Sequence, residues 1–148
     1  PPFLKELSHY EWVELALDIS EAELPEDVNA EGDLLDGHPV QSPLAWSLAY
    51  QYPVHCIRPE FQPTEPSEHP TYLLVYRNVE FDVKFMEING VTARLLHLFH
   101  EQPELTGRQA LEMIAQELQH PQPEMVVNGG LETMQQLREA GVLLGIAV

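Results

Sequence analysis

The sequence predicts an α+β fold: an N-terminal helix and an acidic linker, followed by a domain with a small antiparallel sheet and three helices. The main observation is a change in the spacing of apolar residues at Asn89-Gly90. Before this dipeptide they recur at every second position, the period of a half-buried strand, at Val79, Phe81, Val83 and Phe85. After it they recur at the spacing of one helix face, at Val91, Leu95, Leu98 and Phe99. A strand therefore leads directly into a helix, and two further helical patterns follow.

Residues 1–42 are expected to form a helix and a linker. Residues 1–19 carry an apolar stripe with helical spacing, formed by Phe3, Leu7, Tyr10, Val13 and Leu17. One amphipathic helix cannot bury its apolar face alone. We therefore expect this helix to pack on the rest of the chain and to be the last helix of a preceding, absent domain. Residues 20–42 are acidic and interrupted by Pro25, which predicts a solvated linker, with residues 20–40 the most exposed part of the chain.

Residues 43–148 are expected to form the folded domain. The strand patterns are at 46–54 and at 71–88, the second being an antiparallel hairpin, and a proline-rich loop separates them. Asn89 is a favourable N-cap for a first helix, and Thr106 with Gln109 has capping-box spacing for a second. The tail 142–147 is predicted to be a strand that joins the same sheet.

The third helix of this domain is predicted to begin at Pro123 and to stop at Gly141. Its apolar stripe consists of Val127, Leu131 and Met134, so we expect Met134 to be buried. The dipeptide Gly129-Gly130 lies inside it, at a cost of roughly 1 kcal/mol per glycine relative to alanine. Either the helix is broken there or a neighbouring segment approaches closely.

Composition and charge exclude several functional classes. The net charge is −17, and residues 1–37 alone carry eleven carboxylates and one lysine. Because DNA binding depends on lysine and arginine contacts to phosphates, the chain is poorly suited to hold nucleic acid. No apolar run approaches the ~20 residues of a membrane span, and the single Cys56 cannot form an intrachain disulfide. We therefore expect a cytoplasmic protein without a membrane partner.

The sequence predicts no catalytic group, metal site or cofactor, and hence no enzyme. His97 and His100 lie one turn apart with Glu101 beside them, a spacing that metal ligands also use. Polar residues on the outer face of a helix need no function, however, and we favour a structural interpretation. Cys56, next to a strand end, is expected to be a small buried apolar residue. Neither a phosphate-binding loop nor a nucleophile elbow is present.

The first helix contains a candidate contact for another protein. Tyr10 lies on the apolar stripe, whereas His9 and Trp12 point elsewhere. Two interpretations remain open. Trp12 packs on the proline-rich loop, or His9 and Trp12 contact a partner, since tryptophan is a favoured interface anchor.

The order of elements after Thr71 resembles that of a winged helix. A hairpin, three helices and the stretch Gly-Val-Leu-Leu follow one another, and Glu87-Ile88-Asn89 leads into the first helix. This order is similar to that of the winged-helix peptide-recognition elements typified by the peptide chaperone of pyrroloquinoline quinone biosynthesis. The resemblance covers about half of the chain and implies a winged-helix-like domain that binds a peptide.

Four stretches spread over nearly the whole chain resemble a second family. They are HYEWVELAL (9–17), LAYQYPVHCIRPEFQP (48–63), FMEINGVTARLL (85–96) and LREAGVLLG (137–145). They are similar to the C-terminal portion of the HvfC-type family, whose members are described as having a DNA-binding N-terminal domain. The resemblance implies a partner protein in the biosynthesis of peptide natural products. It would be encoded beside a multinuclear non-haem iron oxidase and a small Cys-containing precursor peptide.

The leading hypothesis is a non-catalytic protein that binds the precursor peptide and presents it to the oxidase. An exposed strand edge accepts an extended peptide as an added strand, and we expect the 79–87 strand, beside the third helix, to be that edge. The residues expected to line it are Phe81, Val83, Phe85, Leu131 and Met134. The alternative is a DNA-binding transcription regulator. It would have to bind DNA through the absent domain, because a helix that reads DNA needs basic residues around it and the third helix has only Arg138.

Overall fold

The computed structural model describes residues 1–148 and contains four α-helices, a 3-10 helix and two small antiparallel sheets, which confirms the α+β class. In chain order the elements are α1 (Leu4–Ile19), β1 (Val28–Asn29), β2 (Pro39–Gln41), β3 (Ala45–Tyr50), the 3-10 helix η1 (Val54–Cys56), β4 (Thr71–Arg77), β5 (Val83–Ile88), α2 (Gly90–Glu101), α3 (Gly107–Glu117), α4 (Pro123–Glu139) and β6 (Leu143–Ala147). None of the helices combines the length and the apolar character that a membrane span requires.

The strands form two sheets, not the single sheet that the sequence predicts. One sheet has the order β3-β4-β5 and contains the hairpin 71–88 as expected, although the strand expected at 46–54 ends at Tyr50. The tail strand β6 instead lies between β1 and β2. Gly141, at a φ of 85°, reverses the chain after α4. Burial of the next two residues, Val142 and Leu143, then directs β6 towards residues 28–41.

The segment expected to be a solvated linker is only partly exposed. Residues 21–27 are exposed, but β1 and β2 lie within the segment, and Leu34 is 2% exposed. The partner of these strands is the distant tail, which local composition cannot reveal. The proline-rich loop at 59–70 is exposed at nearly every residue. The prediction that residues 20–40 are the most exposed part is therefore wrong.

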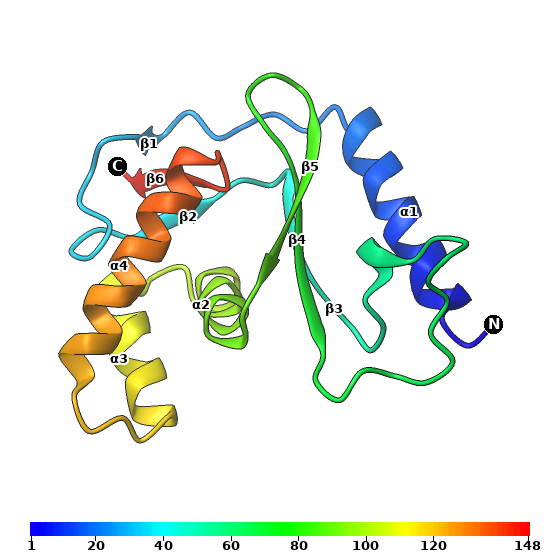
Figure 1. Ribbon diagram of the computed structural model, residues 1–148. Helices are drawn as coiled ribbons and strands as arrows, with labels where there is room; N and C mark the ends of the chain where they lie inside the picture. Colours follow the sequence, from blue (N-terminus) through cyan, green and yellow to red (C-terminus); the bar gives the residue numbers. More distant parts are fainter.

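Two hydrophobic cores lie on opposite faces of the β3-β4-β5 sheet (Figure 1). The central strand β4 is buried between them. Leu74 belongs to the larger core, which is built with α2, α3, α4 and β6, whereas Leu73 and Val75 belong to the core built with α1. The sheet therefore separates α1 from the three C-terminal helices.

Both ends of α1 are bonded to neighbouring segments. The Glu6 carboxylate accepts hydrogen bonds from the backbone N–H groups of Gln51 (3.0 Å) and Tyr52 (2.9 Å). At the other end, Nη1 of Arg77 donates to three carbonyl oxygens, those of Leu17 (3.0 Å), Asp18 (3.3 Å) and Ser20 (2.8 Å). The last carbonyls of a helix lack intrahelical donors, and a cation is favourable there. α1 thus packs on the rest of the chain, as its apolar stripe predicts.

The predicted caps of α2 and α3 are confirmed. The Asn89 side chain accepts a hydrogen bond from the N–H of Thr92 at 2.8 Å. Thr106 and Gln109 form a reciprocal capping box at the start of α3. These local bonds set where each helix begins.

α4 continues through Gly129-Gly130 without a break. A Cβ atom at Gly130 would collide with the buried side chain of Leu111 in α3, whereas one at Gly129 would meet nothing. Close approach of a neighbouring helix therefore explains the second glycine, and the first is unconstrained by packing.

Candidate functional site

The β3-β4-β5 sheet has two open edges, and β5 is one of them. At the hairpin end, the N–H of Asn78 donates to the carbonyl oxygen of Asp82 at 2.9 Å. Hydrogen-bonded pairs alternate along an antiparallel ladder, so the residues of β5 that bond to β4 are Lys84, Met86 and Ile88. The N–H and C=O groups that point away from the sheet are those of Val83, Phe85 and Glu87. β5 thus offers unpaired backbone donors and acceptors to an added strand.

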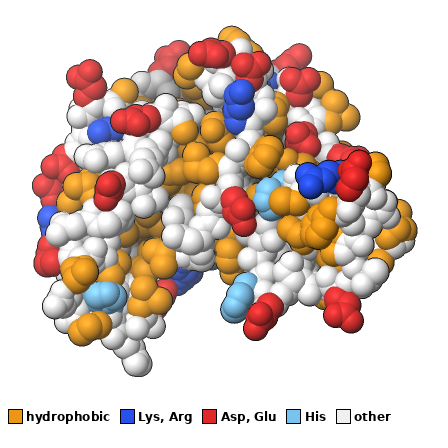
Figure 2. All heavy atoms as spheres, in the orientation of Figure 1, with side chains coloured by type: hydrophobic (Ala, Val, Ile, Leu, Met, Phe, Trp, Pro, Cys, Tyr) orange, Lys and Arg blue, Asp and Glu red, His pale blue; other side chains and the backbone are white.

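The two faces of β5 meet different parts of the molecule. Met86 and Ile88 pack against the larger core, on the side of the three C-terminal helices. On the other face, the ring centroid of Phe85 lies 6.5 Å from that of Tyr10 in α1 and 5.8 Å from that of His55 in η1. The open edge therefore has α1 and η1 beside one face and the larger core beside the other. Figure 2 shows hydrophobic side chains in the middle of the molecule as it is turned in Figure 1, with most carboxylates nearer the rim.

The three hairpin residues predicted to line a binding surface are all accessible. Phe85 is 50% exposed, and Val83 is partly buried against the α1 core. Phe81 is 74% exposed but lies outside the strand, at a φ of 67° in the turn before β5. The turn displaces the strand start from the predicted residue 79 to Val83, because the Asn78 side chain accepts hydrogen bonds from two N–H groups of the turn, those of Glu80 and Asp82.

The two residues predicted from the third helix do not share this surface. Met134 is 0% exposed and fills the larger core, as its position on the apolar stripe predicts, so it has no surface to offer a peptide. Leu131 is partly buried against the same core. α4 packs mainly on α3 and β6, and β5 leads into α2, so the strand and the third helix are not the paired platform that we expect from sequence.

Sequence reasoning missed the neighbours of Phe85 and Glu87. The Nε2 atom of His55 lies 3.3 Å from Oε2 of Glu87, and its Nδ1 atom is buried without a hydrogen-bond partner. Burial raises the pKa of Tyr10 to about 12, and the charge of Glu14 adds to this effect, so Tyr10 stays a neutral phenol at physiological pH. No spacing rule connects α1, η1 and β5, which are distant in the sequence. The fold alone brings them together.

A comparison with protein-family models decides the family. The model of the HvfC C-terminal domain matches residues 42–138, about two thirds of the chain. The chain belongs to the HvfC family. The resemblance found in the sequence is thereby confirmed, while a comparison with curated proteins found no match. The HvfC match begins just before β3 and ends in the last turn of α4, so it contains the whole β3-β4-β5 sheet.

The predicted partner contact of this HvfC-family chain lies on the opposite side of α1 from the β5 edge. Trp12 is 57% exposed, and its ring centroid lies 6.0 Å from that of Trp46 in β3. Nδ1 of His9 lies 2.9 Å from the hydroxyl oxygen of Tyr50. Trp12 therefore lies beside Trp46 of β3. These side chains form an aromatic surface beside the other open edge of the sheet.

The candidate metal ligands of the HvfC-family chain do not converge. His97 and His100 are exposed on α2, and no group of three or more His, Cys, Asp or Glu side chains is close enough to hold a metal ion. Cys56 is exposed, contrary to the expectation of a buried residue, because it ends η1 at the surface and belongs to neither core. The open β5 edge remains the best-defined candidate site.

Proposed function

We propose that this HvfC-family protein is a non-catalytic partner that binds a precursor peptide and presents it to a multinuclear non-haem iron oxidase. An extended segment of the peptide adds to β5 as a fourth strand. The observation that carries the proposal is the row of outward backbone groups on β5. α1 lies beside one face of this strand and the larger core beside the other, so side chains on both faces of the added strand would have neighbours to contact.

In this proposal the oxidase binds at the second open edge, β3. Its outer surface is continuous with the aromatic side chains of His9, Trp12 and Trp46, and a hollow between β3 and α2 is lined by Leu48 and Leu96. Tryptophan is enriched at the centre of protein interfaces. One edge then holds the peptide while the other contacts the oxidase.

The competing role, DNA binding by this chain, is disfavoured by the state of its basic side chains. Five of the seven are engaged within the protein: Arg58, Arg77, Arg94, Arg108 and Arg138. Phosphate contacts need free cations. For a peptide held by backbone bonds and apolar contacts, the dissociation rate should change little with sodium chloride, whereas affinity for DNA would fall by orders of magnitude.

Titration calorimetry with the precursor peptide encoded beside the gene tests the proposal, using Glu87→Pro and Glu87→Ala. The N–H of Glu87 points outward, so proline there removes a donor to the peptide without breaking the β4–β5 ladder. Glu87→Ala loses the same carboxylate and its His55 contact but keeps the N–H. We expect the proline variant to bind about tenfold more weakly and the alanine variant to bind nearly as the wild type.

Two results would contradict this assignment. If the wild type binds no precursor peptide, with or without the oxidase, the peptide-binding role is wrong. If Glu87→Pro keeps its circular dichroism spectrum and binds as tightly as Glu87→Ala, peptide binding stands but addition to β5 does not.

A further inference from the structure

Glu14 lies on the face of α1 that is turned towards the open edge of β5. It follows Tyr10 by four residues, one helical turn, and Tyr10 contacts Phe85 in β5. The C-terminal end of α1 is bonded to Arg77, which is paired with Val83 at the start of β5. Glu14 comes between these two contacts, and therefore lies beside the Val83 end of the edge.

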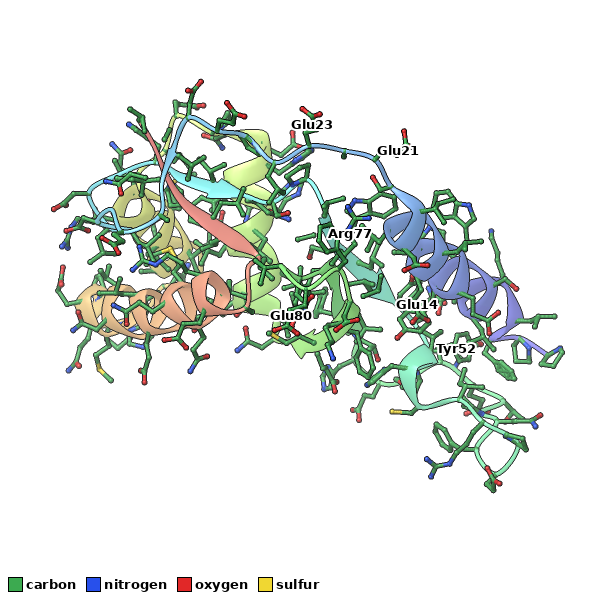
Figure 3. The ribbon with its side chains drawn as sticks, turned by 90° about the horizontal axis from the view of Figure 1, so that it is seen from above. Glu14, Glu21, Glu23, Tyr52, Arg77 and Glu80 are labelled. Atoms are coloured by element: carbon green, nitrogen blue, oxygen red, sulfur yellow. The ribbon has the colours of Figure 1, made fainter.

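The Glu14 carboxylate has no favourable partner within the protein. Burial raises its pKa, the charge of Glu11 raises it further, and neither a hydrogen bond nor a cation opposes these effects. The guanidinium of Arg77 is already bonded to three carbonyl oxygens at the end of α1. Figure 3 shows Glu14 on the side of the molecule where β5 forms the edge, whereas Glu21 lies on the opposite side.

From this geometry we propose that β5 selects a peptide with a lysine or arginine at the position that faces Glu14. Side chains of an added strand alternate between the two faces of the sheet. Those on the same face as Val83 and Phe85 are turned towards α1, and the one next to Val83 meets the Glu14 carboxylate. The inference rests on the proposed strand addition and names the class of peptide that it accepts.

The surroundings suit a long basic side chain. Its aliphatic stem would lie against Val83 and the exposed half of Phe85, and its charged end would reach the unpaired carboxylate. On the other face of β5, Met86 and Ile88 offer apolar contacts. The selected peptide therefore alternates, with apolar residues facing the helices and one basic residue facing α1.

The net charge of the protein acts in the same direction. The chain carries −17, and of its basic groups Lys5 and Lys84 are the two side chains without an ion pair or a hydrogen bond to the protein. A cationic peptide approaches such a surface faster, especially at low ionic strength. An acidic residue beside Glu14 would be repelled, so the same carboxylate also rejects the wrong peptide.

Selection from a library of twelve-residue peptides with every position randomised tests the inference without knowledge of the natural ligand. The targets are the wild type, Glu14→Gln and Glu21→Gln, and the last removes an equal charge from the opposite side of the molecule. Synthetic peptides from the wild-type selection are then measured with their basic residue kept or changed to glutamine. All variants are checked by circular dichroism.

The wild type and Glu21→Gln should enrich lysine or arginine at one position of the register, and Glu14→Gln should not. Changing that residue to glutamine should weaken binding to the wild type about three- to tenfold and leave binding to Glu14→Gln nearly unchanged. Two outcomes would overturn this inference and leave strand addition intact, provided that the selected peptides bind Glu87→Pro more weakly than the wild type. In the first, the wild type enriches no basic residue at any position. In the second, Glu14→Gln enriches a basic residue at the same position as the wild type. Recovery of no binding peptide at all would count against both.

Discussion

Met134 is one of the fully buried residues of α4. It is 0% exposed, and the larger core to which it belongs contains residues of α2, α3, β4 and β6. We predict that Met134→Asp lowers the free energy of unfolding by several kcal/mol, because an unpaired charge there has neither water nor a partner. Gln135→Asp, on the exposed face of the same helix, should change it by less than about 0.5 kcal/mol. Urea denaturation measures both, and equal midpoints would contradict the assigned helical phase.

Glu14 gives the opposite prediction, because its charge is unfavourable in the free protein. Its pKa is raised by burial and by Glu11, so the folded chain binds the Glu14 proton more tightly than the unfolded chain does. Stability is therefore lost as the pH rises through the raised pKa. Glu14→Gln should be at least as stable as the wild type at neutral pH, and the difference should disappear below the ordinary value of 4.5. Thermal unfolding at neutral pH and at pH 4 compares them. A variant that is less stable at neutral pH would show that Glu14 already has a favourable partner.

Among the elements, α4 provides a matched pair of glycines. A Cβ at Gly129 meets nothing, so Gly129→Ala should stabilise the protein by up to about 1 kcal/mol through helix propensity. A Cβ at Gly130 collides with Leu111, which is fully buried and cannot move away, so Gly130→Ala should destabilise it by about 1–3 kcal/mol. Chemical denaturation ranks the two variants. The reverse order would mean that α3 and α4 do not approach each other at Gly130.

The same elements show what sequence reasoning can and cannot reach. Asn89 and Thr106 predict their helices because capping is a bond over three residues, and the hairpin follows from alternation and a short turn. The pairing of β6 with β1 and β2 joins residues more than a hundred positions apart, so no local pattern contains it. Likewise, the apolar stripe of α4 correctly predicts that Met134 is buried, but it does not predict on which side of the β3-β4-β5 sheet α4 lies.

At the scale of the whole molecule, a sheet with two open edges lies between two cores. Its hairpin edge is predictable from the alternation of apolar residues. The placement of Tyr10, Glu14 and His55 beside that edge depends instead on the packing of α1 and η1 on the sheet. That docking relies on Arg77 and Glu6, whose bonds reach backbone groups far away in the sequence. The sequence thus predicts the strand edge of the site, whereas the neighbouring side chains of α1 and η1 become apparent only in the folded structure.

Amide hydrogen exchange, followed by NMR with and without bound peptide, is the most direct test of strand addition to β5. We predict that the amides of Val83, Phe85 and Glu87, which point outward in the free protein, slow by about tenfold or more when the peptide binds. The outward amides of the other edge, Ser47 and Ala49, should keep their rates. Slowing at Ser47 and Ala49 instead, or at neither edge despite saturation with peptide, would contradict the account.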